Sequence, residues 1–224
     1  MPSASDIGKE LVARTPEMAG GLLRQIVEFG INGHPAFPGA KAVAVRELSK
    51  AGEREKAIDA IVVQHVVVAS GQGLATSVGG LLTVPVTLPA NIAAMAVLGV
   101  RMIGAIAHLR GYDVDDQRVR AAIMLALVGE TEVARLLTTN KLPTSPLAVA
   151  TAPMYDAVLE RQVSEEVMAS LAGRLGGKRL TTLALRRIPV VGGGVGAAVD
   201  GWFTHTLADY ARREFVARQG NLGG

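Results

Sequence analysis

Apolar residues recur at helical spacing along most of this chain. Near the N-terminus they fall at steps of three, four or seven residues, on one face of a 3.6-residue period, which predicts an amphipathic helix over residues 5–30. The apolar positions of that helix are Leu11, Met18, Leu22, Ile26 and Phe29. Glycines and prolines end this helix, and a second, short helix is predicted over residues 39–50, closed by Gly52.

The strongest pattern is a run without any Asp, Glu, Lys or Arg over residues 60–100. Its centre is interrupted by Gly71, Gly73, Gly79, Gly80, Pro85 and Pro89. The run therefore predicts two helical arms, about 57–75 and 89–107, that face each other across a Gly/Pro hinge. At ~1.5 Å rise per residue, each arm nearly matches the ~30 Å hydrocarbon core of a bilayer.

The composition of the two arms is less typical of a membrane than their length. Val, Ala and Gly dominate, and these residues contribute little free energy of insertion. A helix that is apolar on all sides is also found at the centre of a soluble bundle. Insertion in lipid and burial in a protein core therefore both stay open for the hairpin at residues 57–107.

Later helices are predicted over residues 116–128, 154–173 and 196–218. Asp115 is the predicted N-cap of the first of them, because a short carboxylate side chain can accept a hydrogen bond from the first free backbone N–H groups. Residues 130–152 are mixed in character and contain prolines, so we predict an internal linker there.

These elements predict an all-α fold, a helical bundle around the central apolar Gly/Pro-hinged helical hairpin. The chain divides into an N-terminal amphipathic helix at residues 1–33, a helical domain at residues 34–219 and a disordered tail at residues 220–224.

Composition narrows the classes of function. The chain has no cysteine, which excludes disulfides and thiolate metal sites. Phe, Tyr and Trp are scarce, so little aromatic surface is available for stacking on nucleic-acid bases. The net charge of +3 predicts only weak attraction to anionic surfaces. Residues 1–14 are polar and carry no signal-peptide core, so we expect a cytoplasmic location.

Positive charge is concentrated in one segment, with no acidic residue between Glu166 and Asp200. Its cations are Arg174, Lys178, Arg179, Arg186 and Arg187. A basic helix over residues 178–187, next to apolar segments, fits an anionic lipid surface. A solvated helix face is the open alternative for the same pattern.

Arg101 is the single charged residue of the second arm. In a hairpin that turns near residue 82, it lies level with Val63 and within one helical turn of Asp59 and His65. Because a buried charge is costly without a partner, we predict an ion pair between Asp59 and Arg101 at the base of the hairpin.

Patterns for catalysis are weaker. Residues 192–197 satisfy a glycine fingerprint for dinucleotides, yet no second strand follows them. Residues 75–79 resemble a nucleophile elbow, but their flanks are predicted to be helical. The four histidines show no spacing typical of metal ligands. We therefore expect no enzyme, no cofactor and no metal.

Several segments together resemble the EcsC protein family. They are Gly79-Gly80 with Pro85 and Pro89, Arg101 to Ile103, Ala107 to Asp113, Asp115 to Arg120, and Ile188 to Gly196 followed by Asp200. The resemblance covers about residues 40–217. It implies a bacterial helical protein without an established catalytic mechanism, so no catalytic residues carry over. The family's name comes from a gene cluster with an ABC transporter linked to secretion, which implies a membrane-associated or accessory role.

The leading interpretation is a non-enzymatic, membrane- or lipid-associated protein. It would lie on the cytoplasmic side, peripheral to the inner face of the membrane or inserted in it, and assist a transport or secretion complex. The alternative is a soluble helical bundle that binds an apolar ligand or self-associates, and a hydrolase-type enzyme is third. A membrane or lipid is the expected partner, nucleic acid is disfavoured, and a homo-oligomer stays open.

Overall fold

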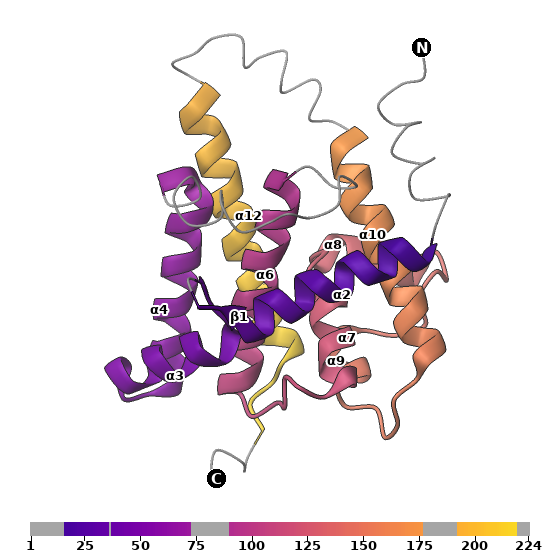
Figure 1. The fold of residues 1–224 in the computed structure, drawn as a ribbon, viewed down its shortest axis with the longest axis horizontal. Helices are drawn as coiled ribbons and strands as arrows, with labels where there is room; N and C mark the ends of the chain where they lie inside the picture. Colours follow the sequence, from indigo (N-terminus) through magenta and orange to yellow (C-terminus); the bar gives the residue numbers. More distant parts are fainter. Residues whose placement is uncertain (1–15, 36, 73–89, 177–191, 219–224) are drawn as a thin grey trace.

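The computed structural model describes residues 16–35, 37–72, 90–176 and 192–218, which form a bundle of helices (Figure 1). The α helices are α2 (Pro16–Asn32), α3 (Ala40–Ala51), α4 (Arg54–Val67), α6 (Ala90–Leu109), α7 (Gln117–Ala126), α8 (Glu130–Thr138), α9 (Pro146–Ala150), α10 (Ala157–Gly176) and α12 (Gly192–Glu214). A π-helical turn, η1 (Val68–Gln72), extends α4. The prediction of a mostly helical bundle is confirmed, whereas the predicted hinge lies outside the described residues.

Helix α6 occupies the centre of the bundle. It packs against α2, α3, α4, α7 and α12, and its side chains at Met102, Ile103 and Ile106 are completely buried. Because neighbours surround it, this helix is apolar on all sides rather than on one stripe. The described part of the second predicted arm is therefore protein core. Within the described ranges, no helix combines the length and the apolar character needed to cross a membrane.

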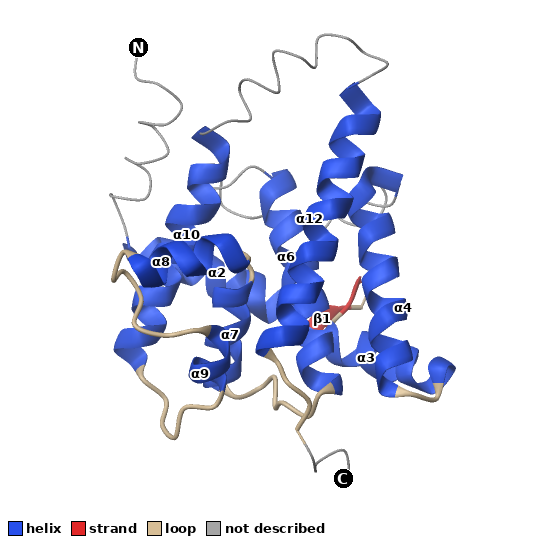
Figure 2. Ribbon diagram, turned by 180° about the vertical axis from the view of Figure 1, so that it is seen from behind, coloured by secondary structure: helices blue, strands red, loops and turns tan. Residues whose placement is uncertain are grey.

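Helices α4 and α12 flank α6 along its length (Figures 1 and 2). One face of α4 is buried in the core through Ala57, Ile58 and Ile61. The opposite face leaves Val63 and Val67 exposed at 63% and 51% of their surface. The described part of the first predicted arm is thus one-sided, half in the core and half on the surface.

Helix α2 crosses α6 and also contacts α10 (Figure 1). Its apolar face belongs to the common core, with Leu23 and Ile31 fully buried. The helix runs to Asn32 and leads into a short antiparallel ribbon of β1 (Gly33–His34) and β2 (Phe37–Pro38). The sequence did not predict this ribbon, because two-residue strands are too short to show an alternating pattern.

The approach of α2 to α6 depends on Gly30. A Cβ atom at this position would lie 2.5 Å from Val100 Cγ1 and 2.9 Å from Val100 Cβ, closer than real atoms approach. We expect Gly30→Ala to reduce the free energy of unfolding by ~1–3 kcal/mol, a typical cost of overpacking. The matched control is Gly21→Ala in the same helix, where a Cβ meets nothing within 4 Å. Urea denaturation of both variants measures the difference, and equal stability would contradict this packing.

The predicted linker at residues 130–152 is wrong, because it contains α8 and α9. Helix α9 begins as short helices commonly do, with Ser145 as N-cap and Pro146 in the first turn. Five residues are too few to show helical periodicity, and the prolines of this segment mark a helix start rather than only a loop.

The predicted cap of the next helix also moves by one residue. Asp116, and not Asp115, caps α7, accepting a hydrogen bond from the Arg118 backbone N–H at 2.8 Å. Asp115 instead lies 2.8 Å from Lys41 Nζ on α3. Either of two adjacent aspartates can cap a helix. Here Asp115 pairs with Lys41 of α3, and Asp116 is the residue that caps α7.

Candidate functional site

Charge is distributed unevenly along helices α4, α6 and α12. The charged residues of α4 all precede residue 60, and those of α12, apart from Asp200, follow residue 208. Arg110, just after α6, makes two hydrogen bonds to Glu55, at 2.8 and 3.0 Å, and Asp59 lies 2.6 Å from Arg212. These contacts join α4, α6 and α12 at one end of the bundle, the charged end.

The opposite end of the same helices is uncharged. It comprises η1 and the C-terminal part of α4, the N-terminal half of α6 and the start of α12. Both views show these helix ends, together with the C-terminal end of α10, on the same side of the bundle (Figures 1 and 2). We call the part of this side formed by α4, η1, α6 and α12 the uncharged end. The exposed side chains of Val63 and Val67 lead towards it along α4.

Most of the predicted basic surface lies beyond the described part of the chain. Lys178, Arg179, Arg186 and Arg187 fall outside the described residues, and so does the side chain of Arg174 near the end of α10. The basic surface therefore stays a prediction. The structure nevertheless fixes the two helix ends between which these residues occur in sequence, the end of α10 and the start of α12.

The predicted ion pair between Asp59 and Arg101 is replaced by other contacts. Asp59 is largely exposed and pairs with Arg212 of α12. Arg101 is buried, with only 6% of its surface exposed, and contacts His65 instead. The register of α4 against α6 was estimated closely enough to bring His65 within reach. The position of α12 beside α4, which decides the partner of Asp59, has no signal in the local sequence.

The buried contact of Arg101 has a defined geometry. Its Nε donates to His65 Nε2 at 3.0 Å, and its guanidinium lies 4.2 Å from the ring centre of Phe37. Because Nε2 accepts, Nδ1 carries the ring hydrogen and donates to the Ile61 carbonyl at 2.7 Å. The sequence suggested Arg101 but missed Phe37, since a cation–π contact leaves no pattern in the sequence.

Burial and nearby positive charges keep His65 neutral and lower the pKa of Arg101. Burial, then the charges of Arg101 and Arg46, lower the pKa of His65 to about 3. Burial and the charge of Arg46 likewise lower the pKa of Arg101 to about 10. At neutral pH the pair is a neutral imidazole beside a guanidinium cation. The negative charge that normally accompanies a buried arginine is missing from its contacts within the described residues.

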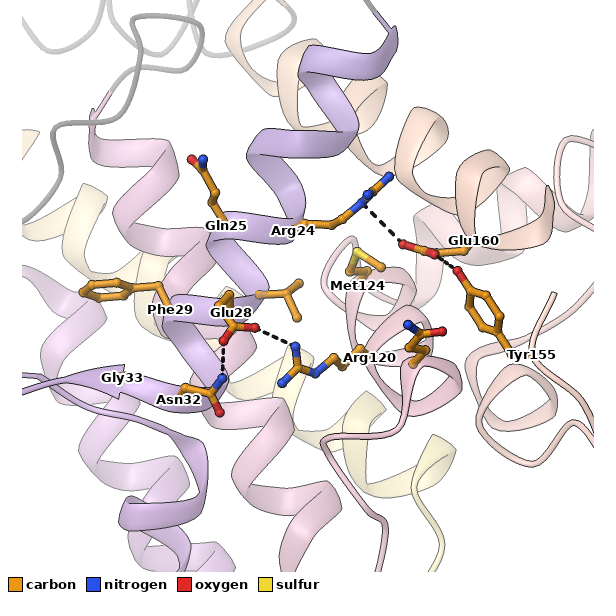
Figure 3. Close-up of a pocket in the computed structure, with 12 residues that line it drawn as sticks. Arg24, Gln25, Glu28, Phe29, Asn32, Gly33, Arg120, Met124, Tyr155 and Glu160 are labelled. Carbon is orange, nitrogen blue, oxygen red and sulfur yellow. Dashed lines mark hydrogen bonds and ion pairs between the residues drawn. The ribbon is translucent and has the colours of Figure 1, made fainter. Parts of the chain in front are cut away.

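A cavity of about 670 Å³ lies between α2, α7 and the start of α10. Figure 3 shows that its charged groups are joined to one another. Glu28 of α2 accepts hydrogen bonds from Asn32 and, at 2.6 Å, from Arg120 of α7. On the opposite wall, Glu160 accepts a hydrogen bond from the Tyr155 hydroxyl and lies 3.7 Å from Arg24. The polar side chains thus hold the walls of the cavity together.

The titration of these groups limits the chemistry of this cavity. Hydrogen bonds from Arg120 and Asn32 lower the pKa of Glu28, so it is ionised at neutral pH. The hydrogen bond to Glu160 raises the pKa of Tyr155 to about 12. Neither group titrates near pH 7, where a general acid or base is most effective. Glu28 and Tyr155 are therefore not prepared for proton transfer at neutral pH.

A second cavity, of about 810 Å³, lies between α8, α10 and α12. Trp202 stands at its margin with 69% of its surface exposed. Its carboxylates are also paired, since Glu132 contacts Arg135 and Glu166 contacts Lys141. Across the described ranges, no group of three His, Asp or Glu side chains is arranged to hold a metal ion.

These features define a mostly helical protein with an enclosed central helix, in which most charges of α4 and α12 lie at one end. The chain belongs to the EcsC protein family, whose sequence model matches residues 44–219. The match begins within α3 and includes α12, so the resemblance inferred from the sequence is confirmed, while α2 lies outside it. No curated protein sequence and no solved structure matches the chain.

Proposed function

We propose that this protein is a non-enzymatic, membrane-associated member of its family that contacts lipid through the uncharged end of the bundle. It would act at the cytoplasmic face of the membrane as an accessory to a transport or secretion complex. The segment at residues 73–89 would form the Gly/Pro hinge between α4 and α6 and present apolar side chains to the bilayer.

One observation carries this proposal. The helices that border residues 73–89 and those that border residues 177–191 end on the same side of the bundle (Figures 1 and 2). The first segment has no charged residue and the second has four cations. Stable membrane association commonly needs two signals, an apolar one and a basic one. Because both segments are attached at one end of the bundle, both could contact the same membrane surface.

The remaining surface favours the same orientation. Val63 and Val67 are exposed on the part of α4 that approaches the uncharged end. The ion pairs Glu55–Arg110 and Asp59–Arg212 lie at the opposite end, where water solvates them. Moving paired surface charges into lipid costs much free energy, whereas moving valine side chains into lipid costs little. An approach with the uncharged end first is therefore the one with the smallest desolvation cost.

Vesicle flotation tests the basic part of this contact. We expect the triple variant Arg179→Gln, Arg186→Gln, Arg187→Gln to bind phosphatidylserine-containing vesicles roughly 100-fold more weakly, since each cation contributes ~1 kcal/mol near an anionic surface. The matched control removes three exposed cations at the charged end, Arg54→Gln, Lys56→Gln and Arg213→Gln. Equal losses in both triple variants, or equal binding of the wild type to neutral vesicles, would argue against the proposal.

Washing of native membranes separates a purely electrostatic contact from one that includes the apolar segment. High salt screens charges and releases proteins held only by them. We expect part of the protein to stay bound after high salt because the apolar segment contributes as well. Complete release by salt alone would exclude insertion of the hinge and leave only the basic contact.

A further inference from the structure

The strongest unexplained feature of the core is a buried cation that lacks a counter-charge. Arg101 is more than nine-tenths buried at the junction of α4, α6 and β2. Within the described part of the chain, its contacts are the neutral His65 and the ring of Phe37, and no carboxylate pairs with it. An unpaired charge in a protein interior is strongly unfavourable unless something compensates for it.

The terminal nitrogens of Arg101 are available to a further partner. Nε is taken by His65, but Nη1 and Nη2 make no hydrogen bond to any residue in the ranges described. Neither nitrogen is fully enclosed by the protein, so both border accessible space. A guanidinium presents its two terminal N–H groups as a fork, which matches two oxygen atoms of a phosphate or carboxylate.

A second arginine, Arg46, adds to the positive potential around Arg101. Arg46 of α3 reaches α4, where its Nη2 donates to Gln64 Oε1 at 3.3 Å, one residue before His65. Its charge lowers the pKa of both His65 and Arg101. Its Nε donates to Glu47 at 2.8 Å, and Lys50 donates to the same carboxylate at 3.1 Å. Burial alone would raise the pKa of Glu47, but these two hydrogen bonds lower it, so the carboxylate is ionised.

The local charges therefore do not balance. Arg46 and Lys50 share the carboxylate of Glu47, and Arg101 has no carboxylate partner among the described residues, so these four side chains carry a net charge of +2. A phosphate monoester or inorganic phosphate carries about −1.5 to −2 at neutral pH. A dianion of this kind matches the excess charge, whereas a carboxylate would neutralise half of it.

We propose that Arg101 and Arg46 form a phosphate-binding site at the junction of α3, α4 and α6. Arg101 donates Nη1 and Nη2 to two phosphate oxygens, and Arg46 supplies the second positive charge. His65 and Phe37 are positioning residues, since one holds Nε and the other covers the guanidinium face. The site adjoins the uncharged end, because His65 lies in the last turn of α4, but phosphate binding by the two arginines does not require lipid contact.

Thermal unfolding with inorganic phosphate, compared with sodium chloride at equal ionic strength, tests the site. We expect phosphate to raise the melting temperature of the wild type by several degrees more than chloride does. The apparent phosphate affinity should fall at least 10-fold in Arg46→Gln and be lost in Arg101→Gln. The control Arg54→Gln removes one exposed cation of α4 and should bind phosphate as the wild type does.

Arg46 is partly exposed, so Arg46→Gln remains informative if Arg101→Gln does not fold. The site is refuted if phosphate and chloride act alike on the wild type, or if Arg54→Gln weakens the response as much as Arg46→Gln. Vesicles with phosphatidic acid, used instead of inorganic phosphate, identify the source of the group. An Arg46-dependent stabilisation by these vesicles indicates a lipid headgroup, and stabilisation by inorganic phosphate alone indicates a soluble ligand.

Discussion

The free energy of unfolding is expected to fall by ~1.4 kcal/mol per pH unit, from the His65 contribution, as the pH drops from about 6.5 towards 3. Burial and the charges of Arg101 on α6 and Arg46 on α3 lower the pKa of His65 to about 3 in the folded protein. The unfolded chain therefore takes up a proton below pH 6.5 that the folded chain does not bind. Because the unfolded state binds more protons in this window, stability decreases as the pH falls.

Urea denaturation at half-unit steps of pH measures this slope. The control is His65→Gln, whose side-chain oxygen can still accept the hydrogen bond from Arg101 Nε but cannot titrate. The window from pH 6.5 to 4.5 is the most informative, since the carboxylates of Glu28 and Glu47 have lowered pKa values and titrate mainly below it. His108, whose pKa burial and Lys41 also lower, keeps its share of the slope in both proteins. An identical pH dependence in wild type and variant would disprove the buried neutral pair.

Phe215→Ala is expected to reduce the free energy of unfolding by ~3–5 kcal/mol, the usual cost of removing a buried aromatic ring. Phe215, which follows α12, is completely buried, and its ring meets Tyr112 edge to face with 5.2 Å between ring centres. The backbone carbonyl of Arg110 beside it accepts a hydrogen bond from the Arg218 N–H at 2.9 Å. The cavity left by the ring would loosen the charged end, where α12 is held against α6.

Tyr112→Phe is the matched control for this aromatic pair. The Tyr112 hydroxyl is buried without a hydrogen-bond partner among the described residues. Removing it keeps the ring contact and eliminates an unsatisfied polar atom, so we expect stability to be unchanged or slightly higher. A loss comparable to that of Phe215→Ala would mean that the hydroxyl, and not the ring packing, holds this end together.

Glycines in the sequence mark the ends of two helices. Gly52 ends α3 with φ +69°, and Gly111 follows α6 with φ +86°. Both positions need a left-handed backbone that glycine adopts without strain, and Gly52 was predicted as the end of its helix on this ground. The central apolar arms were also predictable, because the absence of charge over residues 60–100 has few explanations other than burial or lipid.

Partner choice and short elements could not be predicted in the same way. Asp59 pairs with Arg212, which is 153 positions away in the chain, because α12 packs beside α4. Helix α9 and the β1–β2 ribbon are too short for a periodic pattern. The sequence predicted part of the Arg101 cluster, because a lone arginine in one apolar arm and a lone histidine in the other indicate a buried polar contact. Its positive excess depends on Arg46 of α3, which only the tertiary structure brings near.

The orientation of the bundle on a membrane can be measured directly, because the chain has no cysteine and a single one can be introduced for labelling. A single cysteine carrying an environment-sensitive dye can be placed at Val67→Cys, exposed near the uncharged end, or at Ser49→Cys, exposed near the end of α3. On addition of anionic vesicles, the account predicts a blue-shifted, brighter signal from Val67→Cys and an unchanged signal from Ser49→Cys. Equal responses at both positions, or a response at Ser49→Cys alone, would contradict it.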